Sequence, residues 1–159
     1  FIGGPYPYDI SAYHYAYFQD ERAFGRPLPD YRPEDLLRRL ELYNVKWIVC
    51  WSGACREYFR KYAGYYSRAA WLGKFELFEA SGYEPTAFLK GSGRASADYG
   101  KIEVADAHPE DGEIVLKYRW DPGFRAVPPV AIGRFPVEGD PVGFIRVKDP
   151  PEKFFLYLP

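Results

Sequence analysis

A run of apolar and aromatic residues near the end of the chain, EIVLKYRW at positions 113–120, leads directly into the turn sequence DPGF at 121–124. Two further runs of the same kind follow, GFIRV at 143–147 and FFLYL at 154–158. β-Branched and aromatic residues favour strands, whereas Pro and Gly favour the turns that separate them. The C-terminal part of the chain is therefore predicted to be a small β-structure.

A segment rich in Gly, Ser, Ala and Pro, between residues 81 and 100, divides the sequence into two parts. It includes Gly91-Ser92-Gly93, which we interpret as part of a linker. We expect an α+β chain, with an N-terminal α/β subdomain over residues 1–88 and a C-terminal antiparallel β-sandwich-like module over residues 89–159. Turn residues separate the expected strands of this module at nearly regular intervals, as in sandwiches and partial barrels. These strands are expected at 101–105, 113–120, 130–135, 143–148 and 153–158.

The N-terminal part is predicted to combine helices with strands. Pro33 suits the first position of a helix, Leu36 and Leu40 recur at helical spacing, and Asn44 suits a left-handed residue at the helix end. Ser52 is predicted to cap a second helix. The remaining elements are expected at 12–24 (a short helix), 45–50 (a strand), 55–63 (the second helix) and 74–79 (a strand that pairs with the earlier one).

The composition limits the classes of partner. The 159 residues include 21 basic and 22 acidic side chains, a formal net charge of −1, with no basic stripe. Binding to a nucleic-acid backbone therefore has little electrostatic support. The aromatic fraction is 19%, which favours large burial and also surfaces that are apolar at one end and wet at the other.

The start of the sequence and its hydropathy bear on its origin. The chain begins with Phe1 and contains no Met, so we expect it to be an excised or processed segment of a longer protein. No apolar run approaches the ~20 residues that a membrane-spanning helix needs. A signal peptide is not visible either.

The two cysteines, Cys50 and Cys55, are separated by four residues that include Gly53. A turn at this spacing lets the sulfur atoms meet, so we predict a small-loop disulfide and an oxidising compartment. The alternative is a pair of free, partly buried thiols. Two thiols alone do not make a structural zinc site, and the spacing is not that of a redox Cys-x-x-Cys motif.

Three short motifs, taken in order, resemble a known group of proteins. They are LELYNVKWIV at 40–49, GKFELFE at 73–79 and YRWDPGFRA at 118–126, and Phe124 stands where the resembling proteins usually have Trp. The chain resembles the soluble extracytoplasmic region of GT-C-like and YfhO-like polytopic membrane proteins. The resemblance implies a parent protein with many transmembrane helices that transfers a sugar from a lipid-linked donor. It also implies that the catalytic acidic residues lie on loops outside this segment, so no catalytic residue is assigned here.

Several groups invite a catalytic or metal-binding interpretation without supporting it. The candidate carboxylate pairs for glycoside hydrolysis are Glu76 with Glu79, or Asp106 with Glu110 and Asp111. Glu76 and Glu79 fall on opposite faces of a regular strand, which argues against a pair. The segment 106–113 lacks the spacing of an EF-hand loop, and a Pro-Glu-Asp-Gly turn explains its composition. We therefore predict no metal site and no cofactor.

Exposed aromatic side chains are the most plausible ligand-binding groups. Trp51, Tyr118 and Trp120 are the candidates for a platform on which a sugar ring stacks, and core packing is the alternative for each. Contact with lipid headgroups is an alternative role for Tyr65-Tyr66 and for the tyrosines between positions 6 and 17.

The leading functional expectation is accessory. The segment is expected to be an extracytoplasmic domain of a multi-pass membrane protein, with the transmembrane region of the same polypeptide and a glycan or lipid-linked sugar as partners. A stand-alone carbohydrate-binding module is the first alternative, and a small glycoside hydrolase is the second.

Overall fold

The computed structural model of the chain describes residues 18–19, 21–98 and 100–159. Of these residues 51% lie in strands, so the protein is β-rich and its sheets are antiparallel. The chain divides into two compact units, residues 1–85 and 86–159. The described part contains two short α-helices, both in the first unit: α1 (Pro33–Leu42) and α2 (Gly53–Lys61).

The first unit starts with a small antiparallel sheet in the order β1-β2-β3. Its strands are β1 (Phe18–Gln19), β2 (Arg22–Ala23) and β3 (Arg26–Pro27), and the short 3₁₀ helix η2 (Leu28–Asp30) follows. The prediction of a helix over 12–24 is therefore wrong for the described residues 18–19 and 21–24; residues 12–17 and 20 lie outside the described residues. Glu21 and Phe24 adopt positive φ angles of 63° and 49°, which a right-handed helix excludes.

Helix α1 forms as its sequence predicts. Pro33 occupies its first turn, and Leu36 and Leu40 are fully buried. Asn44 follows the helix with φ 59°, the left-handed conformation expected at this position. The amide of Val45 then donates to the Leu40 carbonyl, at 2.8 Å, and directs the chain into the next strand.

A three-stranded antiparallel sheet in the order β4-β6-β5 makes up the rest of the first unit. The expected pairing of β4 (Trp47–Cys50) with β6 (Phe75–Ala80) is confirmed, with Trp47 opposite Glu79 and Cys50 opposite Glu76. The third strand, β5 (Tyr66–Leu72), was not expected.

Helix α2 covers one face of this sheet. The Phe59 ring lies 4.8 Å from the ring of Tyr66 in β5 and 5.4 Å from that of Phe78 in β6. All three side chains are fully buried. The helix begins as predicted, because the Ser52 hydroxyl accepts a hydrogen bond from the Cys55 amide at 3.2 Å.

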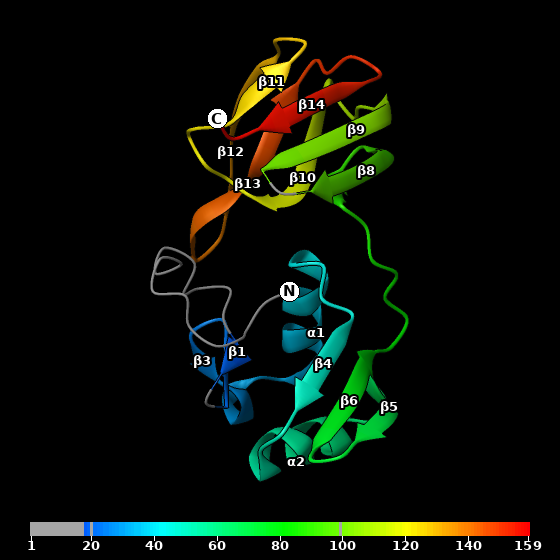
Figure 1. Ribbon diagram of the computed structural model, residues 1–159. Coiled ribbons are helices and arrows are strands. Elements are labelled where there is room, and N and C mark those ends of the chain that lie inside the picture. Colours follow the sequence, from blue (N-terminus) through cyan, green and yellow to red (C-terminus); the bar gives the residue numbers. More distant parts are fainter. Residues whose placement is uncertain (1–17, 20, 99) are drawn as a thin grey trace. The chain divides into compact units, whose positions relative to one another are not determined.

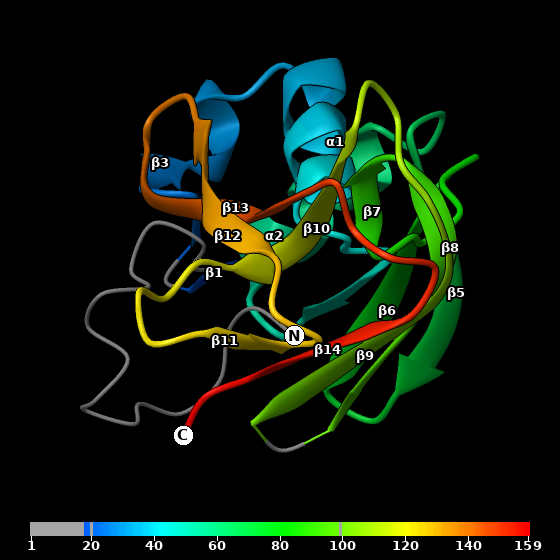
Figure 2. The same ribbon diagram turned by 90° about the horizontal axis from the view of Figure 1, so that it is seen from above.

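The second unit consists of two four-stranded antiparallel sheets (Figures 1 and 2). The strands of the first, in spatial order, are β12 (Ala131–Val137), β13 (Asp140–Lys148), β10 (Glu113–Arg119) and β7 (Phe88–Lys90). Those of the second are β11 (Arg125–Val127), β14 (Phe154–Tyr157), β9 (Lys101–His108) and β8 (Ser92–Asp98).

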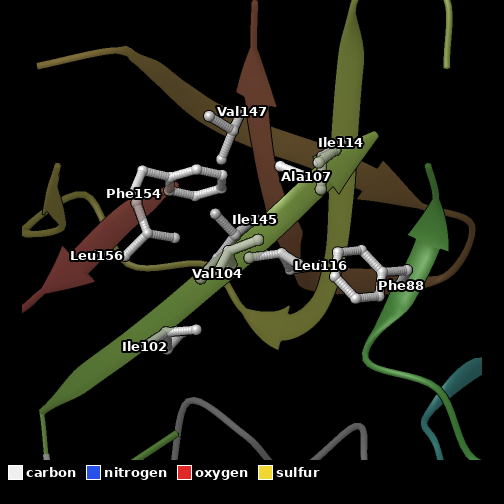
Figure 3. Close-up of a cluster of buried hydrophobic side chains, with 10 residues drawn as sticks. All are labelled: Phe88, Ile102, Val104, Ala107, Ile114, Leu116, Ile145, Val147, Phe154 and Leu156. Atoms are coloured by element: carbon white, nitrogen blue, oxygen red, sulfur yellow. The ribbon is translucent and has the colours of Figure 1, made fainter. Parts of the chain in front are cut away.

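Strands of both sheets contribute to one buried apolar cluster, whose side chains point toward one another in Figure 3. Aliphatic and aromatic side chains fill it, most of them at alternate positions of their strands. Its members are Phe88, Ile102, Val104, Ala107, Ile114, Leu116, Ile145, Val147, Phe154 and Leu156.

The interpretation of Gly91-Ser92-Gly93 as a linker is wrong, because Ser92 and Gly93 belong to strand β8. Gly93 is needed there by the close approach of the neighbouring strand. A Cβ atom at this position would lie 2.9 Å from the carbonyl oxygen of Asp106 in β9. Glycine therefore lets the two backbones meet where any other residue would separate them.

A buried ion pair joins β10 to β13 at a register shift between the two strands. The Asp140 carboxylate, fully buried, accepts from both terminal nitrogens of Arg119, one of them at 2.9 Å. It also accepts from the amides of Val142 and Gly143, at 2.8 and 3.2 Å. Four hydrogen bonds thus satisfy a carboxylate that is removed from water.

Candidate functional site: an exposed apolar face in the first unit

The face of the β4-β6-β5 sheet that α2 does not cover is apolar and exposed. Along β4 the side chains alternate, so that Ile48 and Cys50 are buried while Trp47 and Val49 remain 50% and 53% exposed. A strand whose outward positions are also large and apolar differs from the usual half-polar strand of a two-layer structure. Strand β4 therefore has two apolar faces. The inner face packs into the core, and the outer face is exposed.

The strand register extends this face across the sheet. Val49 lies opposite Leu77 of β6, and Phe75 of β6 lies opposite Leu72 of β5. Residues directly opposite each other in an antiparallel pair project from the same side of a sheet. The outer face consequently carries apolar side chains from all three strands.

Four of the exposed apolar side chains lie at one end of the sheet, where the strand register brings together the β5–β6 turn and the end of β4. The course of these elements can be followed in Figure 1. Trp51 directly follows β4, and the turn between Leu72 and Phe75 lies at the same end. We name Trp51, Trp71, Leu72 and Phe75 the tip cluster. Leu72 and Phe75 project from the outer face, whereas Trp71, opposite Glu76, projects from the side of the sheet that α2 covers. Their exposed fractions are 66%, 53%, 56% and 38%.

A disulfide between Cys50 and Cys55 fixes the segment that carries Trp51. The bond joins the last residue of β4 to the first turn of α2, with the two Cα atoms 5.6 Å apart. Both cysteines are buried, and the Ser52 cap lies between them. The short closed loop therefore holds the Trp51 side chain outward, away from the core below it.

Basic side chains lie against two rings of the tip cluster. The guanidinium carbons of Arg56 and Arg60, both on α2, lie 5.8 and 5.7 Å from the centre of the Trp71 ring. The Lys74 ammonium lies 5.4 Å from the Phe75 ring. Cations at these distances are attracted to the ring faces, so the aromatic groups and the positive charges hold one another in place.

A buried carboxylate organises part of this basic group. Glu76, on the inner face of β6, is fully buried and accepts from Arg60 Nε at 3.1 Å and from Arg60 Nη2 at 2.7 Å. Arg68 of β5 approaches the same carboxylate at 3.7 Å. Two cations therefore share one anion, and the end of the sheet keeps an excess of positive charge.

Acidic groups lie at the opposite end of the sheet. Lys46 there pairs with Glu79 at 3.2 Å and with Glu84 at 3.1 Å. The hydrogen bond to Glu84, followed by that to Glu79, raises the pKa of Lys46 above its usual value. The charges of the sheet are thus divided, with basic groups around the tip cluster and acidic groups at the far end.

The residues predicted to form an aromatic platform belong to different units. Trp51 lies in the tip cluster of the first unit. Tyr118 and Trp120, in the second unit, are partly buried and pack against its apolar cluster. Burial raises the pKa of the Tyr118 hydroxyl. Tyr66, one of the tyrosines considered for lipid contact, is fully buried, whereas the tyrosines between positions 6 and 17 lie outside the described residues.

Glu76, Glu79 and Asp106, three of the carboxylates considered for catalysis, are engaged in separate ion pairs. Glu76 is buried against Arg60 and Glu79 pairs with Lys46, on opposite faces of β6, as its strand alternation predicts. Asp106 pairs with Arg94 at 2.5 Å. In the described part of the chain no group of three or more His, Cys, Asp or Glu side chains is placed to hold a metal ion.

The sequence pattern did not reveal Trp71, Leu72 and Phe75 as members of a surface. The signal was present, since WLGKF at 71–75 places large apolar residues on both sides of a Gly-Lys turn. Turns of soluble hairpins are ordinarily polar, so such a sequence indicates a contact made by the turn itself.

Comparisons of this chain with protein-family models, with curated proteins and with solved structures find no match. Among the described residues, no helix combines the length and apolar character needed to cross a bilayer.

Proposed function

We propose that the chain is a non-catalytic, extracytoplasmic domain of a multi-pass membrane protein, accessory to the transfer of sugar from a lipid-linked donor. The observation that carries the proposal is the tip cluster beside a disulfide. Four large apolar side chains exposed at one end of a sheet favour a surface that meets another phase or partner. A closed pair of cysteines favours an oxidising compartment.

The choice of a sugar-transferring parent rests on the resemblance of the motifs at 40–49, 73–79 and 118–126. An accessory role agrees with the engagement of Glu76, Glu79 and Asp106 in separate ion pairs with arginine or lysine. The proposed partner is therefore the transmembrane region of the same polypeptide, and the proposed ligand is a glycan or a lipid-linked sugar.

We further propose an α+β division of the chain, with a β-sandwich-like second unit. Both helices belong to the first unit, and the two four-stranded sheets of the second contribute to one apolar cluster. A sandwich of this kind is a scaffold that presents loops at its ends, and it needs no catalytic group of its own.

The proposal is tested on the native protein in its source cells, detected with an antibody against this chain. We expect it to stay with membranes after alkaline carbonate extraction and to be cleaved by a protease added outside the cytoplasmic membrane. Recovery in the soluble fraction refutes membrane attachment, and protection from external protease refutes the extracytoplasmic side. A freely secreted form would direct the search to glycan binding by an independent module.

A further inference from the structure

We propose that the tip cluster of Trp51, Trp71, Leu72 and Phe75 binds the surface of a lipid bilayer that carries anionic headgroups. The inference rests on the proposed function only for the presence of a nearby bilayer. It goes further by assigning the contact to one end of the β4-β6-β5 sheet and by naming the lipid charge that this end selects.

The apolar part of the argument comes from the composition of the tip. Three of its four members are aromatic, and two of these are tryptophans that are more than half exposed. Indole rings partition to the boundary between headgroups and acyl chains, because one side of the ring is apolar and the N–H still needs a polar partner. Leu72, at the turn, is 56% exposed and has no polar atom to keep it in water.

The charged part of the argument comes from the cations around the tip. Arg56, Arg60 and Lys74 lie against the rings of Trp71 and Phe75. Cations beside interfacial aromatic groups are placed to reach lipid phosphates while the rings enter the apolar boundary. Each Lys or Arg near an anionic bilayer adds to the attraction.

The distribution of charge along the sheet orients the domain. Glu79 and Glu84 flank Lys46 at the end far from the tip. Glu57 and Lys61, both exposed on α2, offset each other. An anionic surface therefore attracts the tip and repels the opposite end, so the hairpin turn points toward the headgroups.

A bilayer suits this surface better than a sugar does. Sugar sites combine a stacking ring with several hydrogen-bond donors and acceptors aimed at ring hydroxyls. At the tip the charged groups in contact with the rings of Trp71 and Phe75 are cations, and Leu72 and Phe75 add apolar area without hydrogen bonds. Cations with apolar side chains match a phosphate-bearing interface.

The test is co-sedimentation of the 159-residue chain with vesicles of phosphatidylcholine alone and of phosphatidylcholine mixed with phosphatidylglycerol. We expect binding to the mixed vesicles and much weaker binding to the neutral ones. Leu72→Ser should weaken binding by roughly tenfold, and Lys74→Gln by about fivefold. The matched controls are Leu89→Ser, at a leucine that is 38% exposed in the second unit, and Lys148→Gln, at an exposed lysine of β13; both should bind as the parent chain does.

Tryptophan emission provides a measurement that does not depend on the serine variant folding. Binding should shift the emission to shorter wavelength, and Trp51→Phe should reduce that shift. Absence of binding to the mixed vesicles overturns the inference, and so does binding that Leu72→Ser and Leu89→Ser weaken equally. Self-association of the chain through the tip, lost in Leu72→Ser without any vesicle binding, also overturns it in favour of a second copy.

The two proposals fail separately. If the native protein resists carbonate extraction while the 159-residue chain does not bind vesicles, the result agrees with the proposed function and refutes the lipid contact. If, conversely, the chain binds vesicles strongly while the native protein is not integral to the membrane, the result refutes the multi-pass parent protein and supports the lipid contact.

Discussion

Removal of the Cys50–Cys55 disulfide is expected to lower the free energy of unfolding of the first unit. The size of the loss depends on the length of the loop that the disulfide closes. The bond joins residues five positions apart. For so short a closed loop the chain-entropy relation gives about 2 kcal/mol at 25 °C. In a unit of this size that loss lowers the unfolding midpoint by roughly 8–16 °C. Reduction is also expected to release the segment that carries Trp51.

The assay is thermal unfolding followed by tryptophan emission, with and without a thiol reductant and in the double variant Cys50→Ala/Cys55→Ala. Trp47, Trp51 and Trp71 belong to the first unit and Trp120 to the second, so the signal reports mainly on the first. Mass spectrometry after alkylation establishes whether the bond is closed before heating.

A matched variant separates the two units. Val104→Ala removes buried side-chain volume from the apolar cluster of the second unit, so it should leave the transition reported by Trp47, Trp51 and Trp71 unchanged. Equal midpoints for the oxidised, reduced and double-alanine proteins would show that the bond does not constrain the first unit, and the reasoning from loop length would be refuted.

Three further predictions concern buried groups. Asp140→Ala should lower the free energy of unfolding in urea by about 3 kcal/mol. The substitution leaves Arg119 opposite an apolar side chain and two backbone amides without their acceptor. A loss below 1 kcal/mol, about the value of a surface ion pair, would contradict this. Gly143→Ala should cost at least about 2 kcal/mol, since its φ is +75° and a Cβ atom would overlap the Phe135 carbonyl oxygen, whereas Gly53→Ala, in open space, should stay within about 1 kcal/mol of the parent. Desolvation raises the pKa values of Tyr58, Tyr66 and Tyr118 above the ordinary 10.0, so the folded state keeps protons that the unfolded chain releases at high pH. The free energy of unfolding should therefore keep its full value below pH 10 and decline as the pH rises further. Tyrosinate absorbance should then rise together with unfolding, and titration of all tyrosines near 10 in a folded protein would contradict the prediction.

The elements that sequence reasoning identified are those in which local chemistry and burial agree. Helix α1 has Pro33 at its start, two buried leucines at helical spacing and Asn44 at its end. Strand β10 buries Ile114, Val115 and Leu116 in succession, and β13 buries Phe144, Ile145 and Val147. In such segments, propensity and tertiary packing act in the same direction.

The strands that escaped detection have weak or interrupted patterns. Strand β5 is exposed over most of its length, and its register with β6 shifts between Arg68 and Ala70, which interrupts the alternation. Strand β8 has the sequence SGRASAD, whose small and polar residues are typical of linkers as much as of an edge strand. Its pairing depends on β9, a contact that composition does not reveal.

The candidate site was predicted only in part, for a related reason. Trp51 was predicted from the sequence, as a candidate for a sugar-stacking platform. Trp71 and Phe75 join it only because β5 and β6 form a hairpin whose turn lies at the end of β4. To predict which face of the sheet is exposed, one must know which face α2 covers. The contacts of Phe59 with Tyr66 and Phe78 determine that, and they join α2 to both β5 and β6.

The boundary between Pro85 and Thr86 has an evolutionary consequence. The polypeptide passes from one unit to the other once, and each of the sheets formed by the described strands lies wholly on one side of that point. A recombination event at this codon junction would exchange either half without cutting a ladder of hydrogen bonds. The gene can therefore acquire a different second half while the disulfide-bearing first half is inherited whole.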